Sequence, residues 1–258
     1  VTMELLYYYA LAHQDSFDVR WIRARSIAEE LIAPLAERLI AQHQLTVLGG
    51  TLVTSLNTEE SGHGIRSVAT RSQASGATAE LEGVDAVVLA VGARGMRGVM
   101  AQSPACAQAA PELVAAGELG AIDVVSVRLW LDRHVSVADP ANVFSRFAAL
   151  RGAGATFFML DQLQKSTERE LWGGADPQGS VIASDFYNAS LITSLSDDEI
   201  VATLMQELLP QVVPAFRQAR VVDSEVRRYP GSVSLFSPGS FRQRPPLETS
   251  LDAVVCAG

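Results

Sequence analysis

The chain has 258 residues, of which 48% are hydrophobic and 19% charged, and its formal net charge is −9 at pH 7. This length allows one large domain or two modest ones, with enough apolar residues for a sizeable core. The acidic balance and the lack of a basic stripe argue against a nucleic-acid partner, which needs clustered Lys and Arg. No apolar run approaches the roughly 18–20 residues that a membrane-spanning helix needs.

A helical pattern occupies the later part of the first forty residues. Ile27, Leu31, Leu35 and Leu39 recur at helical spacing, with charged residues on the other face. Proline is tolerated in the first turn of a helix and disrupts an interior. We therefore expect a second helical segment to begin at Pro34.

A β-rich stretch follows the helical pattern. Short alternating segments separated by glycine-containing turns predict a small antiparallel meander. Its expected strands are residues 46–48, 51–56, 65–70 and 77–81. Residues 84–92 then form a nearly continuous apolar run that ends in glycine. Such a run is typical of a parallel strand that is covered on both faces.

The second half of the chain has a different pattern. Val125, Val127, Leu129 and Leu131 alternate with polar or larger residues, which predicts a strand with one buried face. Further strands are expected at three places, residues 155–160, 181–187 and 221–228.

The clearest helix of the chain lies between the last two of these strands. Ser196 and Glu199 have the spacing of a capping box, in which each side chain bonds to the other residue's free backbone N–H. The expected buried stripe of this helix consists of Ile200, Val201, Leu204 and Leu208, and Pro210 is expected to end it.

Motifs for protein-borne catalysis are weak. Residues 92–98 read G-x-x-G-x-x-G, whereas the dinucleotide fingerprint is G-x-G-x-x-G, so we interpret them as a glycine-rich strand exit rather than a phosphate loop. No G-K-[ST] or G-x-S-x-G sequence is present, and the four histidines form no metal-binding frame. Cys106 and Cys256 read as free thiols. We identify no catalytic residue and no metal site, a pattern that suits an enzyme whose cofactor carries the chemistry.

Several segments, in this order, resemble the FAD-dependent amine oxidase superfamily, and in particular its carotenoid (phytoene and zeta-carotene) desaturase branch. Residues 12–21 with the helix to Pro34 resemble "SFD-x-x-W … P", and residues 49–54 resemble "GG-x-x-VT". Residues 85–92 resemble "DAVI-x-AVG". Further matches are residues 181–187 with 195–200, which resemble "ADFY … LSDEEI", and residues 251–258, which resemble the start of "NLF-x-AGD".

This resemblance implies a mixed α/β fold: a partial FAD-binding, Rossmann-like domain with an antiparallel β-meander, and a substrate domain with a mixed or antiparallel sheet and flanking helices. Residues 1–40 would be a helical part of the substrate domain and residues 41–100 the partial FAD domain. Residues 101–245 would be the substrate-binding domain, and residues 246–258 the start of the final FAD-domain strand. The family's N-terminal G-x-G-x-x-G turn and closing Asp are missing from the sequence, so we expect an incomplete chain that lacks its main phosphate anchor.

The resemblance also implies FAD as the cofactor. The backbone of Val53 would lie against the adenine, and the other residues next to the cofactor would be Ala90, Val91, Gly92, Ala257 and Gly258. Aromatic residues of the second half are candidates for the lining of an apolar substrate pocket; the alternative is that they build the core of the sheet. They are Trp130, Phe157, Phe158, Phe186, Tyr187 and Phe236.

The resulting hypothesis is an FAD-dependent oxidoreductase that dehydrogenates or isomerises an apolar, carotenoid-like small molecule by hydride transfer to the flavin. One alternative is a flavin amine oxidase that acts on a polar amine, which would need a carboxylate or an aromatic cage in the pocket. Another is a fragment that binds no flavin of its own. The resemblance suggests a plastid or membrane-associated protein with peripheral membrane contact, and the sequence leaves the location and oligomeric state open.

Overall fold

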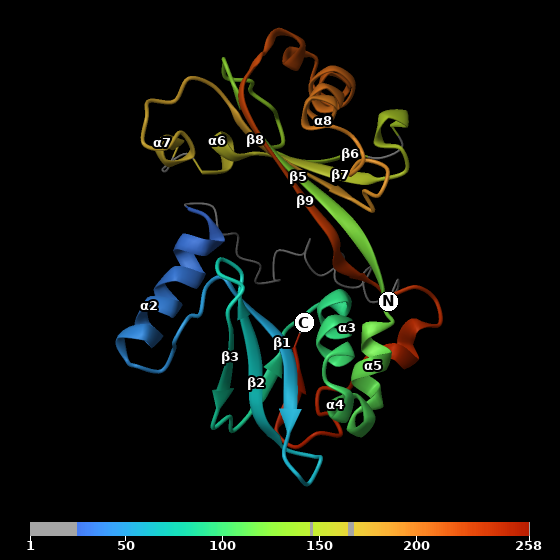
Figure 1. Ribbon diagram of the computed structural model, residues 1–258. Helices are drawn as coiled ribbons and strands as arrows, with labels where there is room; N and C mark the ends of the chain where they lie inside the picture. Colours follow the sequence, from blue (N-terminus) through green and yellow to red (C-terminus); the bar gives the residue numbers. More distant parts are fainter. Residues whose placement is uncertain (1–24, 145–146, 165–167, 258) are drawn as a thin grey trace, which may run out of the picture. The chain divides into compact units, whose positions relative to one another are not determined.

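The structure of the protein is a computed structural model, which describes residues 25–144, 147–164 and 168–257 (Figure 1). The chain divides into two compact units, each described here by itself. One comprises Val1–Thr46 and Leu160–Pro177, and the other comprises Val47–Met159 and Gln178–Gly258. The segment at residues 12–21 that resembles the "SFD-x-x-W" motif lies outside the described residues.

The described part of the first unit is helical. A π-helical turn, η1 (Ala28–Ile32), runs into α2 (Ala33–Ala41), which has Pro34 in its first turn. This confirms the predicted second segment, because proline lacks only an N–H that the first turn leaves unbonded anyway. Two short helices, α6 (Leu160–Leu163) and α7 (Glu168–Leu171), complete this unit.

The second unit begins with the meander. Strands β1 (Thr51–Thr58), β2 (Ile65–Ser72) and β3 (Thr78–Glu82) pair antiparallel in the order β1-β2-β3, as predicted. The strand expected at residues 46–48 was wrong, because these residues have no strand conformation and pair with none of the described strands.

A two-stranded parallel sheet follows the meander. Strands β4 (Val87–Leu89) and β10 (Val254–Cys256) pair in register, although most of the chain lies between them. The parallel strand predicted in residues 84–92 is therefore confirmed. It is shorter than expected, and one of its faces is open: Leu89 is 5% exposed, whereas the neighbouring Val88 is 62% exposed.

Three helices that the sequence patterns did not predict pack beside these strands (Figure 1): α3 (Ala93–Ala101), α4 (Pro104–Ala109) and α5 (Pro111–Gly117). The expected glycine-rich strand exit was wrong in one respect, because Gly95 and Gly98 lie inside α3. Helix packing outweighs the low helix propensity of glycine here, since Met96 is buried in the core. A Cβ at Gly117 would lie 3.1 Å from the backbone of Arg97, so glycine allows α5 to approach α3 closely.

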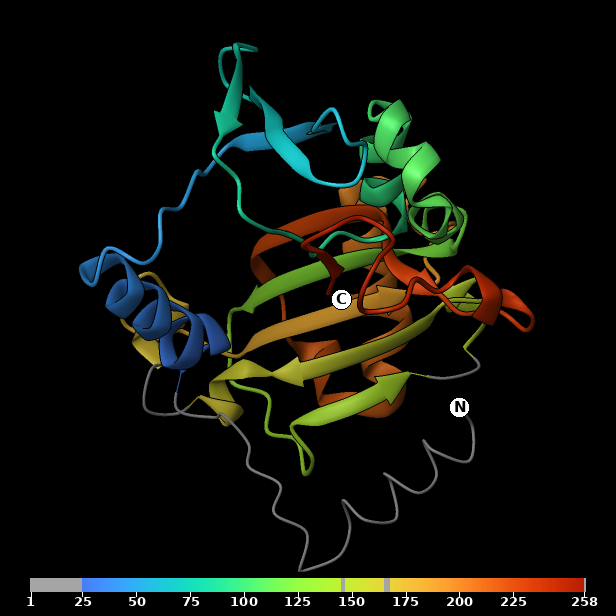
Figure 2. The same ribbon diagram turned by 90° about the horizontal axis from the view of Figure 1, so that it is seen from below.

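The larger sheet of the unit is antiparallel, with the order β6-β7-β8-β5-β9 (Figure 2). Its strands are β5 (Gly120–Leu131), β6 (Ala141–Phe144), β7 (Gly154–Met159), β8 (Val181–Tyr187) and β9 (Val221–Leu235). All but the short β6 were predicted. Strand β9 runs past the expected end: it continues to pair with β5 beyond a register shift between Ile122 and Val124. Pro230 is tolerated because β9 lies at the edge of the sheet.

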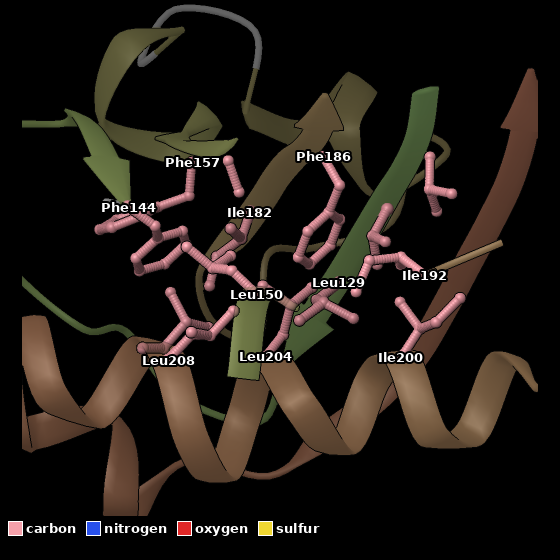
Figure 3. Packing of buried hydrophobic residues seen from close by; sticks show 14 of the residues in the cluster. Leu129, Phe144, Leu150, Phe157, Ile182, Phe186, Ile192, Ile200, Leu204 and Leu208 are labelled. Carbon is pink, nitrogen blue, oxygen red and sulfur yellow. The ribbon is translucent and has the colours of Figure 1, made fainter. Parts of the chain in front are cut away.

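A helical layer covers one face of this sheet (Figure 3). It consists of α8 (Asp197–Ala202), the π-helical η4 (Thr203–Leu208), α9 (Leu209–Val212) and the 3-10 turn η5 (Pro214–Gln218). The predicted capping box is present, with Glu199 N donating to Ser196 Oγ (3.2 Å) and Ser196 N donating to Glu199 Oε2 (2.8 Å). Pro210 does not end the helical path as predicted, because it occupies the first turn of α9.

The core between sheet and helices is closed. Ile200, Leu204 and Leu208 are fully buried and point toward Phe144, Phe157, Phe186 and their neighbours (Figure 3). Phe157 lies 5.1 Å from Phe144 and 6.2 Å from Phe216 between ring centroids. Every helix within the described ranges is too short or too polar to traverse a lipid bilayer.

Candidate functional site

A large cleft opens over β1, β4 and α3, and we call it the β1–β4 cleft. Its volume is about 860 Å³, and Leu52, Val53, Val88 and Val91 are among its lining residues. These four side chains are 40–62% exposed, although valine and leucine are usually buried. An exposed apolar surface of this kind makes the cleft a candidate binding site.

Two arginines give this apolar cleft a positive charge. Arg71 comes from β2 and Arg94 from the first turn of α3, and no Asp or Glu is among the lining residues. The guanidinium of Arg94 donates to the carbonyl oxygen of Pro230 at 3.4 Å. The cleft runs along α3, from Arg94 in its first turn to Gln102 at its C-cap. Its apolar lining and its arginines suit the cleft to a ligand that has an apolar part and a negative charge.

A second, smaller cleft lies beside the parallel strands, and we call it the β4–β10 cleft. It has a volume of about 350 Å³, and its lining includes Val91 after β4, Cys256 at the end of β10 and Ala257. In open α/β sheets, ligands bind at the carboxyl ends of parallel strands. Burial, with a smaller contribution from the charge of Glu112, raises the pKa of the Cys256 thiol. Cys256 is therefore protonated at neutral pH and is poorly suited to act as a nucleophile.

The two clefts adjoin and bring three of the six predicted cofactor residues together. Leu89 and Val91 line both clefts, Val53 lines the β1–β4 cleft, and Ala257 lines the β4–β10 cleft. Ala90 and Gly92 flank Val91 and are exposed, but they line neither cleft. Gly258 lies outside the described residues.

The residues that sequence reasoning missed are the arginines. Arg71 and Arg94 line the β1–β4 cleft, and Arg244 lines the β4–β10 cleft. Isolated arginines form no pattern in the sequence. Only the position of Arg94 inside the glycine-rich segment after β4 could have drawn attention to it.

The open face of the five-stranded sheet, opposite the helical layer, carries a third cleft of about 400 Å³. Its lining is mostly polar and includes Ser126, Arg128, Asp185, Glu225 and Arg227. Ser126 Oγ donates to Asp185 Oδ1 at 2.5 Å, and the guanidinium of Arg227 lies 2.5 Å from Glu225 Oε1. This face can bind a polar or charged group.

The aromatic candidates differ in how deeply they are buried. Phe157 and Phe186 are fully buried, so the alternative of core packing holds for them. Trp130 and Phe158 are half-buried, whereas Tyr187 is 39% and Phe236 50% exposed. Phe236 lines the β4–β10 cleft. Among the described residues, no three His, Cys, Asp or Glu side chains lie together in an arrangement that could hold a metal ion.

Comparison with known proteins gives a family. Residues 19–258 match the family described as "Flavin containing amine oxidoreductase". None of the curated proteins matches the chain.

Two solved structures resemble the fold. An oxidoreductase from Methanosarcina mazei aligns with a TM-score of 0.56 at 15% identity, over 86% of this chain and 46% of that chain. At this identity the likeness shows the fold alone, and it agrees with the predicted mixed α/β class. A flavin-dependent brominase, Bmp2, aligns with a TM-score of 0.41 at 10% identity, over 76% of this chain and 42% of that chain, which is too distant to carry an argument. The chain thus spans less than half the length of either protein.

Proposed function

The chain belongs to the family of flavin containing amine oxidoreductases, and on this premise we propose that the protein is an FAD-dependent oxidoreductase whose β1–β4 cleft receives the dinucleotide. The family match supports the predicted flavin cofactor and the oxidoreductase class. The observation that carries the assignment of the cleft is its combination of exposed apolar side chains and arginines with no acidic lining residue.

The residues of the cleft fit the parts of FAD. Val53 on β1 offers an apolar surface and a strand backbone for the adenine, as the "GG-x-x-VT" resemblance implies. Arg71 and Arg94 supply positive charge for the phosphates, which arginine binds in bidentate fashion. Val91 stands where the β1–β4 cleft passes into the β4–β10 cleft, so it would contact the cofactor between its two ends.

FAD, when bound, supplies an acceptor for a hydride taken from the substrate. The protein's task is then to bind the substrate beside the flavin and to exclude water. For this role we propose the open face of the five-stranded sheet, because its opposite face is sealed by the helical layer.

We propose a carotenoid-like, apolar substrate, which rests on the order of the desaturase-like motifs along the chain. Trp130 and Phe158, both half-buried on the open face of the sheet, would supply apolar contacts. Such a substrate dissolves in lipid, so this assignment also implies peripheral association with a membrane.

One observation favours a polar amine instead. Asp185 lies on the open face, and the cleft that it lines also contains Tyr229. A cleft that offers both a carboxylate and an aromatic ring can bind an ammonium group. The hydroxyl of Ser126, which donates to Asp185, would hold the carboxylate in position.

The test is to reduce the bound flavin with each substrate class. The full-length protein should be yellow when purified, and under anaerobic conditions a carotenoid should bleach the flavin absorbance while a panel of amines does not. Bleaching by an amine alone, lost in Asp185→Asn, would overturn the carotenoid assignment in favour of the amine. A correctly folded full-length protein that binds no flavin would overturn both.

A further inference from the structure

The β4–β10 cleft contains a cation that the assignment of the β1–β4 cleft does not use. Arg244 follows the 3-10 turn η6 (Ser240–Gln243) and is the single charged residue among the described residues that line this cleft. The remainder of the lining is apolar apart from Ser234 and Cys256. A lone cation in a mostly apolar cleft favours an anionic ligand.

The guanidinium of Arg244 is held in place by a ring rather than by a carboxylate. Its central carbon lies 3.8 Å from the centroid of Phe236, a distance typical of a cation–π contact. None of the ion pairs among the described residues involves Arg244. The charge of Glu112 acts on Cys256, and its carboxylate accepts a hydrogen bond from Ser250 N at 2.5 Å. The donors of Arg244 are therefore available to a ligand.

The position of Arg244 relates it to the proposed cofactor. The β4–β10 cleft adjoins the β1–β4 cleft through Leu89 and Val91, and it lies at the carboxyl ends of two parallel strands, where α/β proteins bind nucleotides. A dinucleotide whose adenine contacts Val53 would extend past Val91 toward Ala257 and Arg244. The phosphates are the strongly anionic part of FAD, and a planar guanidinium matches their geometry.

We propose that Arg244, oriented by Phe236, is a positioning residue that binds a phosphate of FAD. This inference rests on the proposed function. It adds a phosphate contact from the segment that precedes β10, separate from Arg71 and Arg94 on the other side of β4.

The experiment compares two flavins and two arginines in the full-length protein freed of cofactor. FAD carries the diphosphate and riboflavin carries no phosphate, and fluorescence titration measures the Kd of each. Arg244→Gln should raise the Kd for FAD about tenfold, the usual effect of losing one charged hydrogen bond, and should leave the Kd for riboflavin within about twofold. Arg242→Gln is the matched control, because Arg242 is an exposed arginine of η6 that lines neither cleft, and it should change neither Kd.

Each outcome has a distinct meaning. An unchanged Kd for FAD in Arg244→Gln, or an equal loss of FAD and riboflavin binding, would overturn the role of Arg244 while leaving the proposed function intact. Wild-type protein that is folded and binds neither flavin would overturn the proposed function itself. If Arg244→Gln does not fold, the titration uses Arg244→Met instead, because methionine keeps an unbranched side chain against Phe236. Arg244→Lys restores the positive charge and should recover part of the FAD affinity. If Arg244→Gln leaves the Kd for oxidised FAD unchanged but shifts the midpoint potential of the flavin, Arg244 lies beside the flavin ring, and the phosphate contact is contradicted.

Discussion

Apolar side chains are buried on one face of the five-stranded sheet, whereas several are exposed at the β1–β4 cleft. In the sheet, Leu129 and Phe157 are 0% exposed, and the helical layer from α8 to α9 closes the core (Figure 3). In β4, Leu89 is buried while its neighbour Val88 is 62% exposed, and Val53 and Val91 at the same cleft are 40% and 41% exposed. The sheet and its helical layer bury their apolar side chains against each other. At the β1–β4 cleft, apolar surface stays exposed, and a bound ligand would cover it. We therefore expect the closed core to contribute more to stability and the exposed cleft more to the proposed FAD binding.

The largest expected effect is on the closed core. Phe157→Ala removes a fully buried ring that contacts Phe144 and Phe216, and should lower the free energy of unfolding by about 3–5 kcal/mol. Urea denaturation followed by circular dichroism measures this. Phe158→Ala, one residue away and facing the open side of the sheet, is the control and should cost much less. Similar losses for both would show that the two faces are equally packed.

In the β1–β4 cleft, a substitution should change ligand affinity strongly and stability little. Val53→Glu should weaken FAD binding by about tenfold or more, since a carboxylate would meet the adenine in an apolar cleft, while the unfolding free energy changes by only about 0.5 kcal/mol, as for an ordinary surface change. Leu81→Glu on β3 is the control, because Leu81 is 41% exposed but does not line the cleft. Equal effects of the two variants on FAD affinity would remove the β1–β4 cleft from the binding site.

A smaller effect is expected where the helical layer begins. Ser196→Ala removes the hydroxyl that accepts from Glu199 N, and should cost about 1 kcal/mol of stability. Ser190→Ala, at an exposed serine of the preceding loop, should be neutral in the same urea titration. A neutral Ser196→Ala would mean that core packing alone positions α8.

The smallest expected effect is a pH dependence of local stability around Glu112 and β10. Burial works to raise the pKa of Glu112, but hydrogen bonds from Ser250 and from the backbone of Glu112 itself together outweigh it, so the pKa lies below its ordinary value of 4.5. A carboxyl with a lowered folded-state pKa stabilises the fold above its unfolded pKa, and this contribution is lost as the pH falls through the folded pKa. The protection factors of the β10 amides, which correct the exchange rates for their intrinsic pH dependence, should therefore fall below about pH 4.5 in the wild type. Glu112→Gln should flatten this dependence, and an identical pH profile in the variant would contradict the link between α5 and the segment before β10.

Regular patterns made much of the fold predictable. Alternation from Val125 to Leu131 identified the buried face of β5, and the capping box at Ser196 located the start of α8. Both signals are local, because a strand alternates every two residues and a cap spans three. The helices α3 to α5 were missed because each contains glycine or proline, which are poor helix formers, while Met96 and Leu113 pack these helices into the core.

The candidate site was predictable to a lesser degree. Val53, Val91 and Ala257 came from motif resemblance, and the structure brings them to two adjoining clefts, although their roles stay predictions. Arg71, Arg94 and Arg244 could not be found in this way. An arginine binds an anion wherever its guanidinium reaches it, so its function depends on neighbours that are distant in the sequence.

By itself, the sequence determined the mixed α/β class, the meander, the parallel character of β4 and most strands of the larger sheet, because these depend on local periodicity and on turn residues. Only the tertiary structure decided that β10 pairs with β4 across more than half of the chain, and that Val88 lies open while Leu89 is buried. It also decided which arginines surround the clefts. Pairing partners and exposure follow from where distant segments meet in space, and no local pattern encodes that meeting.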